Sequence, residues 1–333
     1  MRVINVPIES LEERYSASWN KWFPEAFQDM RIDFVNIYPD TLSDHIKDGS
    51  FLDVCGTNYF KAGQLKILTK MLFQDEIGED DVIFFHDIWC PGIEMLQYIR
   101  QGKGMKFKIC GILHAGTYDS YDFLAKQGMA SWGGPLEEVW FSFIDQIYVA
   151  TDFHKELILR KRKIDPDKIK VTGLPIYNKE CPDMRGKENI VVFPHRLDSE
   201  KNPQLFDRLS IEAATKGWRF IKSKEECKTK KEYFELLNRS KIAVSFADQE
   251  TWGIAQQEAL FAKCFPVVPD RLSYKELYLD EFRYYAYDHA VLLVKKLMEP
   301  SKEDFDQLQN NRNVLLRRGD LAIPNIVKEM EKL

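Results

Sequence analysis

Between residues 250 and 268 the chain reads Glu250-Thr251-Trp252-Gly253-Ile254-Ala255-Gln256-Gln257-Glu258 and then, a few residues later, Cys264-Phe265-Pro266-Val267-Val268. A glycine turn, a helix and a buried strand in succession indicate a sheet with crossover helices. Glu250 precedes the turn and Glu258 falls inside the helix, so both carboxylates can face one cleft. Carboxylates accept hydrogen bonds well from hydroxyl groups, and this pair suits the hydroxyls of a sugar and a ribose.

Apolar runs of strand length alternate with helical patterns along the whole chain. Such alternation predicts parallel sheets, and two series of runs predict an α/β protein of two doubly wound domains. Glycine and proline interrupt the chain near Gly173 and Pro175, where we expect the boundary. The expected domains are 1–173 and 174–310, and a final helix over 311–333 is expected to pack back onto the first domain. The expected strands are 2–8, 33–37, 81–86, 107–113, 146–150 and 168–172, followed by 189–194, 218–222, 241–246 and 265–268.

The composition excludes several classes of protein. The 333 residues are 44% hydrophobic and 30% charged, which is globular and long enough for two domains. A net charge of −5 disfavours a surface that grips nucleic acid everywhere, although a local basic patch is compatible with it. The six cysteines are scattered without metal-ligand spacing, and no apolar run could span a membrane. We expect a cytoplasmic protein with no bound metal and no cofactor.

Polar side chains follow four of the expected strands. In open α/β sheets ligands lie beyond the carboxyl ends of the strands, so these positions are the candidate site. They are His86 and Asp87, then His114 with the small-residue turn at Gly116, then His195 and Arg196, and finally Glu250.

Arg196 and Lys201 span the turn after one strand and the start of the next helix. A guanidinium, an ammonium and a helix N-terminus together would hold a diphosphate, whereas the alternative is an ordinary solvated loop. Gly253 would let backbone N–H groups approach phosphate. Glu258 would hold ribose hydroxyls and Glu250 the donor sugar, and the alternative is that both are exposed carboxylates at a helix end.

His114 is the candidate catalytic residue of the first domain, although a histidine at a strand end is more often a structural hydrogen-bonding group. Asp87 is interpreted as the organiser of its loop. The basic run 160–163 is either a solvated helix end or a contact for nucleic-acid phosphates. The aromatic segment 14–23 contains Trp19 and is either core or an acceptor-binding face.

Two C-terminal stretches are similar to family 4 glycosyltransferases of the GT-B class: Pro194-His195-Arg196 through Lys201-Asn202-Pro203, and Ala243-Val244-Ser245 through Pro269-Asp270-Arg271-Leu272-Ser273-Tyr274. They resemble the tRNA-queuosine mannosyltransferases most. Leu113-His114-Ala115-Gly116 resembles the first domain of that family more loosely. The resemblance implies two Rossmann-like domains that face each other across a cleft. It also implies a retaining, metal-independent transfer from a nucleotide-diphosphate sugar.

By the same resemblance, Arg196 and Lys201 would bind the diphosphate, Glu258 the ribose and Glu250 the transferred sugar. His114 would lie near the reacting carbon. The remaining residues expected to line the site are Thr251, Trp252, Gly253, Ile254, His86, Asp87 and Gly116. Two features depart from the family: a polar segment at 7–13 replaces a glycine-rich loop, and His195 stands where glycine is common.

The favoured acceptor is a nucleic acid with a hydroxylated base, and a hydroxymethylated pyrimidine in DNA, modified by a bacteriophage-type enzyme, is the first choice over tRNA. A glycosyltransferase of saccharide or cell-envelope synthesis and a GT-B module that binds nucleotide sugar without turnover are the alternatives. A nicotinamide-dependent oxidoreductase is disfavoured because no GxGxxG follows any expected strand.

Overall fold

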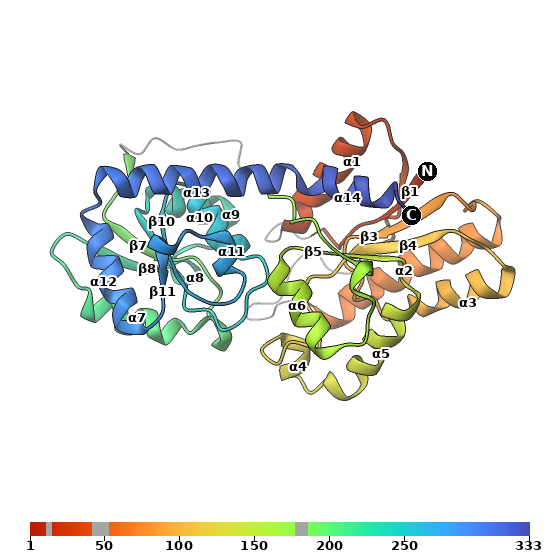
Figure 1. Cartoon of the computed structure of the whole chain (residues 1–333), viewed down its shortest axis with the longest axis horizontal. Helices are drawn as coiled ribbons and strands as arrows, with labels where there is room; N and C mark the ends of the chain where they lie inside the picture. The colour runs from red at the N-terminus through yellow and green to blue at the C-terminus, as the bar shows by residue number, and fades with distance from the viewer. Residues whose placement is uncertain (11–14, 42–52, 177–185) are drawn as a thin grey trace. The chain divides into compact units, whose positions relative to one another are not determined.

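A computed structural model of the chain describes residues 1–10, 15–41, 53–176 and 186–333. The chain divides into two compact units (Figure 1). The first contains residues 1–150, 155–172 and 323–333, and the second contains 151–154 and 173–322. The chain therefore passes from one unit to the other more than once, and the last segment returns to the first unit.

The first unit contains a six-stranded parallel sheet in the order β2-β1-β3-β4-β5-β6. Residues of β3 and β4 are almost wholly buried, which explains why their sequences are continuous apolar runs. The chain goes from β1 to β2 on one side and then returns to place β3 on the other side of β1. The strand order therefore reverses between β1 and β3. The strands are β1 Arg2–Val6, β2 Asp33–Asn36, β3 Asp81–Phe85, β4 Lys108–Ile112, β5 Gln146–Val149 and β6 Ile169–Val171.

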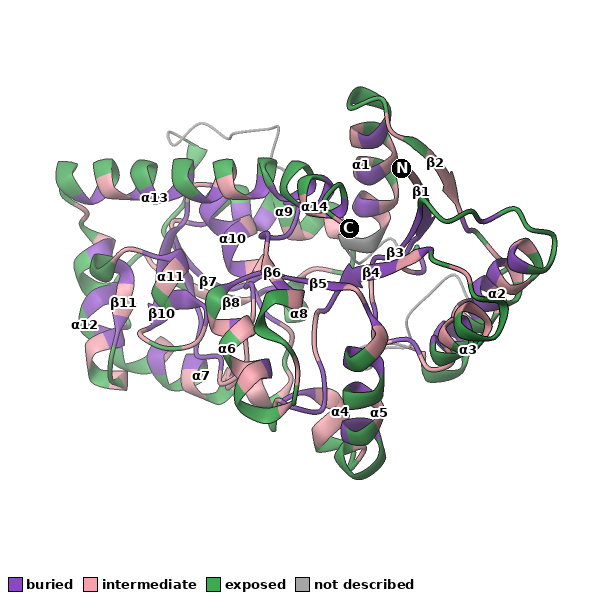
Figure 2. Cartoon of the chain, turned by 45° about the vertical axis from the view of Figure 1, so that its right-hand side comes forward, coloured by how far each residue is buried: buried purple, intermediate pink, exposed green. Residues whose placement is uncertain are grey.

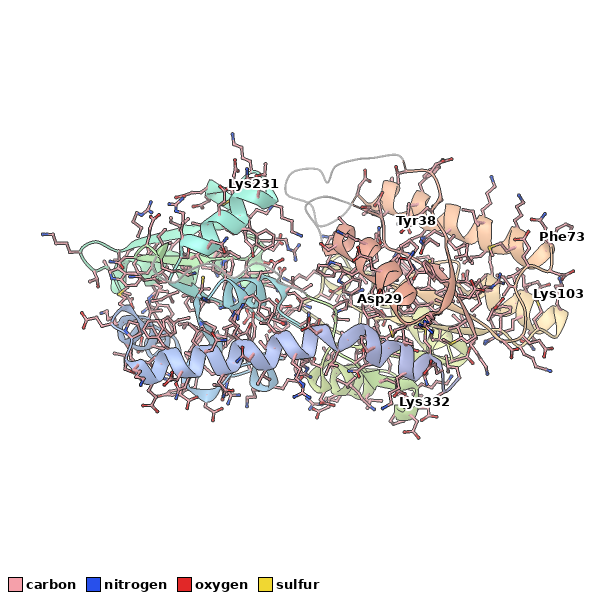
Figure 3. All side chains as sticks on the ribbon, turned by 90° about the horizontal axis from the view of Figure 1, so that it is seen from above. Asp29, Tyr38, Phe73, Lys103, Lys231 and Lys332 are labelled. Carbon is pink, nitrogen blue, oxygen red and sulfur yellow. The ribbon has the colours of Figure 1, made fainter. Side chains whose placement is uncertain are left out.

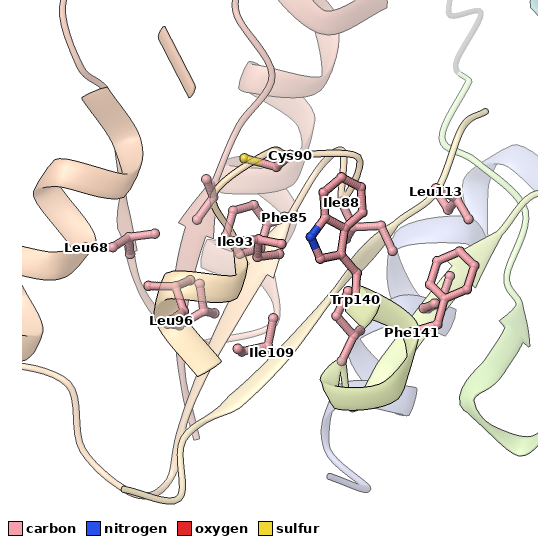
Figure 4. Close-up of a cluster of buried hydrophobic side chains, with 14 of the residues drawn as sticks. Leu68, Phe85, Ile88, Cys90, Ile93, Leu96, Ile109, Leu113, Trp140 and Phe141 are labelled. Carbon is pink, nitrogen blue, oxygen red and sulfur yellow. The ribbon is translucent and has the colours of Figure 1, made fainter. Parts of the chain in front are cut away.

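Helices connect these strands and supply most of the remaining core. Leu68 on α2 and Leu96 on α3 pack with Phe85 of β3 and Ile109 of β4, and Trp140 of α5 lies in the same cluster (Figure 4). Asp53 caps α2 by accepting hydrogen bonds from two N–H groups of its first turn. The helices are α1 Tyr15–Asp29, α2 Val54–Phe73, α3 Glu94–Lys103, α4 Phe123–Lys126, α5 Ala130–Phe143, α6 Asp152–Lys161, η1 Pro166–Lys168 and α14 Ala322–Met330.

The second unit contains a five-stranded parallel sheet in the order β11-β10-β9-β7-β8. Here β8 lies on one side of β7 and β9 on the other, so the strand order reverses between β7 and β9. The strands are β7 Ile190–Phe193, β8 Arg219–Lys222, β9 Ile242–Val244, β10 Phe265–Pro269 and β11 Arg283–Tyr284. The helices are η3 Ser199–Lys201, α7 Pro203–Glu212, α8 Ser223–Glu226, α9 Lys230–Arg239, α10 Ile254–Phe261, α11 Tyr274–Leu277, η4 Asp280–Phe282, α12 Tyr287–Met298 and α13 Lys302–Asp320.

All ten expected strands are present, and the two-sheet α/β architecture is confirmed. The sequence did not indicate β11, because two residues are too few to show an apolar run. The end of the chain, expected as one helix over 311–333, is two helices: α13 within the second unit and α14, most of which belongs to the first.

A substitution at Gly111 in β4 can test how tightly this strand packs against β3 and the segment that follows β3. A Cβ at Gly111 would lie 2.4 Å from the carbonyl oxygen of Phe85 and 2.2 Å from Cγ2 of Ile88. Because backbone cannot move aside cheaply, we expect Gly111→Ala to destabilise the protein by about 1–3 kcal/mol. The measurement is the thermal unfolding midpoint.

The matched control is Gly102→Ala in α3, where a Cβ would have no heavy atom within 4 Å. Alanine in a helix should stabilise by about 0.5–1 kcal/mol relative to glycine. If both variants unfold at the same temperature, the tight packing of β4 is contradicted.

Candidate functional site

The loops after β7 and β9 meet beside the carboxyl ends of these two neighbouring strands. Asp248 N–H donates to the carbonyl oxygen of Glu200 at 2.7 Å. The side-chain amide of Asn202 donates to Phe246 O at 3.0 Å and to Asp248 Oδ2 at 2.7 Å. These bonds hold the expected donor-binding residues of both loops at the point where the strand order reverses, which is the usual ligand position in such sheets.

A buried ion pair joins the two loops. Lys201 Nζ lies 3.3 Å from Glu250 Oε2 and 2.5 Å from the carbonyl oxygen of Gln249, and its side chain is only 7% exposed. Burial raises the pKa of Glu250, but the charge of Lys201 and the N–H of Gly253 outweigh it and leave the pKa below its usual range. The carboxylate therefore stays ionised at neutral pH.

Gly253 caps α10 in the left-handed region at φ 73°, a conformation that favours glycine. Its N–H donates to Glu250 Oε1 at 2.9 Å. A Cβ would also lie 3.2 Å from Tyr274. The N–H of Gly253 thus positions Glu250, and the approach of neighbouring backbone N–H groups to phosphate stays a prediction.

Glu258 lies on α10, as expected, and its anchor differs from that of Glu250. Its Oε2 accepts a hydrogen bond from the hydroxyl of Tyr233 on α9 at 3.0 Å. Burial raises the pKa of Glu258, and Lys230 and Tyr233 offset only part of this effect. The two glutamates are thus held by separate partners, and their surroundings shift their pKa values in opposite directions.

Arg196 and Lys201 differ in exposure and in their ion-pair partners. Arg196 is 41% exposed at its side chain and pairs with Asp198 at 2.9 Å and Glu200 at 3.6 Å. His195 is 3% exposed, and burial with the nearby Lys201 lowers its pKa to about 3. It is therefore a neutral side chain that packs its ring edge against Phe193 at 5.2 Å. Arg196 faces solvent, whereas Lys201 is part of the interior.

The residues between Glu250 and Glu258 differ in burial and in the groups that they contact. Trp252 is 2% exposed, and its ring lies 5.6 Å from the Arg318 guanidinium carbon. The carbonyl of Thr251 accepts from Thr151 Oγ1 at 2.9 Å. Ile254, in the first turn of α10, is half-buried. Trp252 belongs to the core of the second unit, and its role in ligand binding stays a prediction.

Sequence reasoning missed several residues that build this site. Ser273 Oγ donates to the carbonyl of Glu250 at 3.1 Å, and Gln249 and Tyr233 hold Lys201 and Glu258. Ser273 follows β10, the next strand in the sheet, and Tyr233 lies on the preceding helix. Ser273 lies within a stretch that resembles the family, but its sequence position does not show that it contacts Glu250, and no local signal marks Tyr233.

In the first unit, the histidine after β3 is a core residue. His86 is completely buried. The centroids of the His86 and Phe23 rings are 4.3 Å apart, and His86 Nε2 lies 2.8 Å from Asn5 Oδ1. Burial lowers its pKa to about 3, with a contribution from His114. The structure gives His86 a packing and hydrogen-bonding role within the sheet.

His114, after β4, is half-buried, and its Nε2 lies 2.7 Å from the carbonyl oxygen of His86. A carbonyl only accepts, so Nε2 carries the proton. Burial lowers the pKa of His114 despite Asp87 nearby, so the ring is neutral and Nδ1 is its basic nitrogen. Trp19 is buried and lies 5.2 Å from this ring, so in the aromatic segment 14–23 it is a core residue.

Asp87 organises the loop after β3, as expected. Its Oδ1 accepts from Trp89 N–H at 3.1 Å, and its Oδ2 pairs with Lys61 at 2.8 Å. Burial raises the pKa of Asp87, but the charge of Lys61 and the hydrogen bonds from Lys61 and Trp89 outweigh it and leave the pKa below its usual range. At Gly116 a Cβ would lie 2.2 Å from the Tyr118 ring, so packing alone requires glycine there.

The basic run 160–163 does not present four cations to solvent. Arg162 turns inward and pairs with Glu137, which is completely buried, at 2.9 Å. The same nitrogen, Nη2, also donates to Thr117 Oγ1 at 2.7 Å. Arg160 pairs with Glu156 at 2.7 Å. The interpretation of the whole run as a phosphate-binding patch is therefore wrong for Arg162.

The comparisons with known proteins agree with this architecture. No protein-family model matches the chain. A tRNA-queuosine alpha-mannosyltransferase of Drosophila melanogaster is 29% identical over 150 residues, which are 36% of this chain and 39% of that protein. The chain thus matches well under half the length of this curated relative.

Among solved structures, a UDP-forming trehalose-phosphate synthase from Burkholderia xenovorans superposes with a TM-score of 0.65 at 12% identity, covering 99% of this chain and 98% of that chain. The sucrose-phosphate synthase of Thermosynechococcus elongatus gives a TM-score of 0.60 at 11% identity, covering 96% and 98%. The chain has the GT-B fold of glycosyltransferases. Within that class, its sequence is similar to the tRNA-queuosine mannosyltransferase.

Two further observations concern the described residues alone. No group of three or more His, Cys, Asp or Glu side chains in them is arranged to hold a metal ion. None of their helices has the length and apolar character needed to cross a bilayer.

The ion pair of Lys201 and Glu250 can be tested by its effect on stability. Lys201→Met leaves Glu250 buried without its cation, and we expect a loss of about 3–5 kcal/mol in the free energy of unfolding. Adding Glu250→Gln to Lys201→Met removes the uncompensated charge and should recover part of that loss. Denaturant titration measures both variants, and two equal, small losses would show that the pair does not hold the loops.

Because His86 is buried in its neutral form, we expect the free energy of unfolding to decrease at acidic pH. Its folded pKa is about 3, against an ordinary value of 6.5. Below pH 6.5 the unfolded chain binds a proton that the folded chain does not, so the free energy of unfolding falls as the pH falls. In His86→Phe the dependence of that free energy on pH below 6 should be shallower by about 1.4 kcal/mol per pH unit. Unchanged pH dependence would contradict the neutral, buried state.

Proposed function

We propose that this chain is a glycosyltransferase that moves a sugar from a nucleotide-diphosphate sugar to a hydroxyl group on a modified nucleic-acid base. The observation that carries the proposal is the Lys201–Glu250 pair at the β7/β9 reversal of a sheet with GT-B architecture. A half-buried, ionised carboxylate at the ligand edge of such a sheet suits recognition of sugar hydroxyls.

The donor would be held by the second unit. Arg196, whose side chain is partly exposed, would contact the diphosphate, while Lys201 would contribute positive charge and fix Glu250. Glu250 would bind the transferred sugar, and Glu258 the ribose. The UDP-forming synthase with the same fold supports a nucleotide-diphosphate sugar as the donor class.

A retaining, metal-independent reaction is part of the proposal. The bond between the anomeric carbon and the phosphate oxygen breaks, the acceptor oxygen bonds to that carbon on the same face, and the acceptor proton passes to the departing diphosphate. Arg196 and Lys201 would stabilise the negative charge on the leaving group, which is where electrostatic catalysis has most effect. His114, with Nε2 held by His86, is the candidate contact from the first unit.

A nucleic-acid acceptor is supported by the similarity to an enzyme named for a tRNA nucleoside. This similarity favours tRNA as the acceptor over hydroxymethylated DNA, which the sequence alone favoured. Hydroxymethylated DNA is the second acceptor candidate. The inward position of Arg162 removes one of the cations on which the DNA hypothesis rested.

The test incubates the purified chain with UDP-, GDP- and other nucleotide sugars. Each is combined with unfractionated tRNA, with DNA containing hydroxymethylated pyrimidines, or with neither. Mass spectrometry of the digested nucleosides detects a sugar-sized gain on one base. If the nucleotide sugar is hydrolysed but no base gains a sugar, the acceptor is a saccharide rather than a nucleic acid. If no nucleotide sugar is consumed, the chain is a module that binds nucleotide sugar without turnover.

Glu250→Gln tests the site itself. We expect kcat to fall by about 10²–10³-fold, because the amide cannot match the charge that the ionised carboxylate places at the donor sugar. The matched control is Glu303→Gln, an exposed carboxylate in the first turn of α13, which should retain full activity. Equal activity in both variants would exclude Glu250 from the reaction.

A further inference from the structure

Three tryptophans of the first unit form a continuous series from the core to the surface, here called the tryptophan ladder. Trp140 is buried, Trp89 is half-buried, and Trp132 is 47% exposed. The rings of Trp140 and Trp89 lie 5.4 Å apart at 89°, and those of Trp89 and Trp132 lie 6.1 Å apart at 64°. An exposed tryptophan is thus backed by two rings that are themselves packed edge to face.

Hydrogen bonds fix the inner two rings. Trp140 Nε1 donates to Glu94 Oε2 at 3.0 Å, and Trp89 Nε1 donates to Glu137 Oε1 at 3.0 Å. Glu137 also accepts from Thr117 N–H at 2.6 Å and pairs with Arg162. The ladder is therefore preorganised, and Trp132 rests on a surface whose orientation the buried carboxylate sets.

The ladder reaches the surface at the ligand edge of the first sheet. Trp89 lies just beyond the carboxyl end of β3, and Trp132 lies in the first turn of α5, whose exposed face can be followed in Figure 2. A Cβ at Gly133 would lie 2.8 Å from Thr117, which follows β4. The exits of β3 and β4 and the start of α5 are thus in contact, and ligands of such sheets bind at this edge.

Two exposed cations flank the same region. Arg162 Nη2 would lie 3.1 Å from a Cβ at Gly134, two residues after Trp132, so the end of α6 lies beside the start of α5. Lys161 and Lys163 stand on either side of Arg162 and are exposed. An exposed flat ring, together with exposed ammonium groups on a segment that adjoins its helix, is a combination that can bind single-stranded nucleic acid by stacking a base and contacting its phosphates.

We propose that Trp132, supported by Trp89, stacks an unpaired base of a nucleic-acid acceptor while Lys161 and Lys163 contact its phosphates. The inference rests on the proposed function for its acceptor class, and it assigns acceptor recognition to residues that the donor site does not include. It also gives the basic run a divided role: Arg162 anchors the ladder through Glu137, and its two neighbours face solvent.

The experiment measures binding of fluorescein-labelled, unstructured 12-nucleotide RNA and DNA to the full chain by fluorescence anisotropy. Trp132→Ala should raise Kd about 5- to 150-fold, the range that base–aromatic stacking provides. Trp132→Phe, which keeps a stacking ring, should restore most of the affinity. Lys161→Ala combined with Lys163→Ala should reduce the slope of log Kd against log salt concentration by about 1.4.

Phe73→Ala is the matched control. Phe73 is 84% exposed at the end of α2, beside the terminal Lys103 of α3 and away from the strand exits (Figure 3). Removing this exposed aromatic should leave Kd unchanged. If Trp132→Ala binds like the parent chain, or if Phe73→Ala weakens binding equally, the platform is refuted.

Donor hydrolysis by the same variants separates the two proposals. Parent and Trp132→Ala chains should hydrolyse the nucleotide sugar at the same rate, because the ladder takes no part in donor binding. Hydrolysis with no effect of Trp132 on oligonucleotide affinity refutes the platform alone. An absence of hydrolysis in the parent chain refutes the proposed function, and a Trp132-dependent oligonucleotide affinity then still supports the platform as a nucleic-acid site.

Discussion

Parallel strand pairing is the constraint on which the rest of this molecule depends. In both sheets every strand runs in the same direction, so every loop that follows a strand emerges at one edge. The reversal of strand order between β1 and β3, and again between β7 and β9, separates two such loops and leaves room for a ligand. The polar candidate residues that follow these strands lie at this edge, which is where ligands bind in parallel sheets.

Each unit uses a buried carboxylate and a cation to hold the loops at this edge. In the second unit Lys201 and Glu250 join the loops after β7 and β9, and Gly253 gives Glu250 a further hydrogen bond. In the first unit Glu137 and Arg162 fix the segments after β3 and β4 through Trp89 and Thr117. Buried ion pairs contribute little net stability, but removing either partner is costly, so they specify one loop arrangement.

The sequence was a good guide wherever the signal was local. Continuous apolar runs gave all ten expected strands, since a strand buried on both faces needs no partner to be recognised. The eight-residue offset from Glu250 to Glu258, with glycine between, placed one glutamate before α10 and the other within it. The sequence was a poor guide for Arg162. A basic run predicts solvated side chains, and the sequence does not show that the fold brings a buried glutamate from another helix beside Arg162. Trp252 likewise turned out to be core, since its neighbour Arg318 lies on α13.

The sequence by itself determined the α/β class, the two series of strands and the positions of the polar strand exits, because periodicity and glycine turns are properties of neighbouring residues. Tertiary structure decided which polar groups became partners. Tyr233, Ser273 and Glu137 reach their loops only through sheet order and helix packing. Distances between residues far apart in the chain follow from how the core is packed, and no local pattern encodes them.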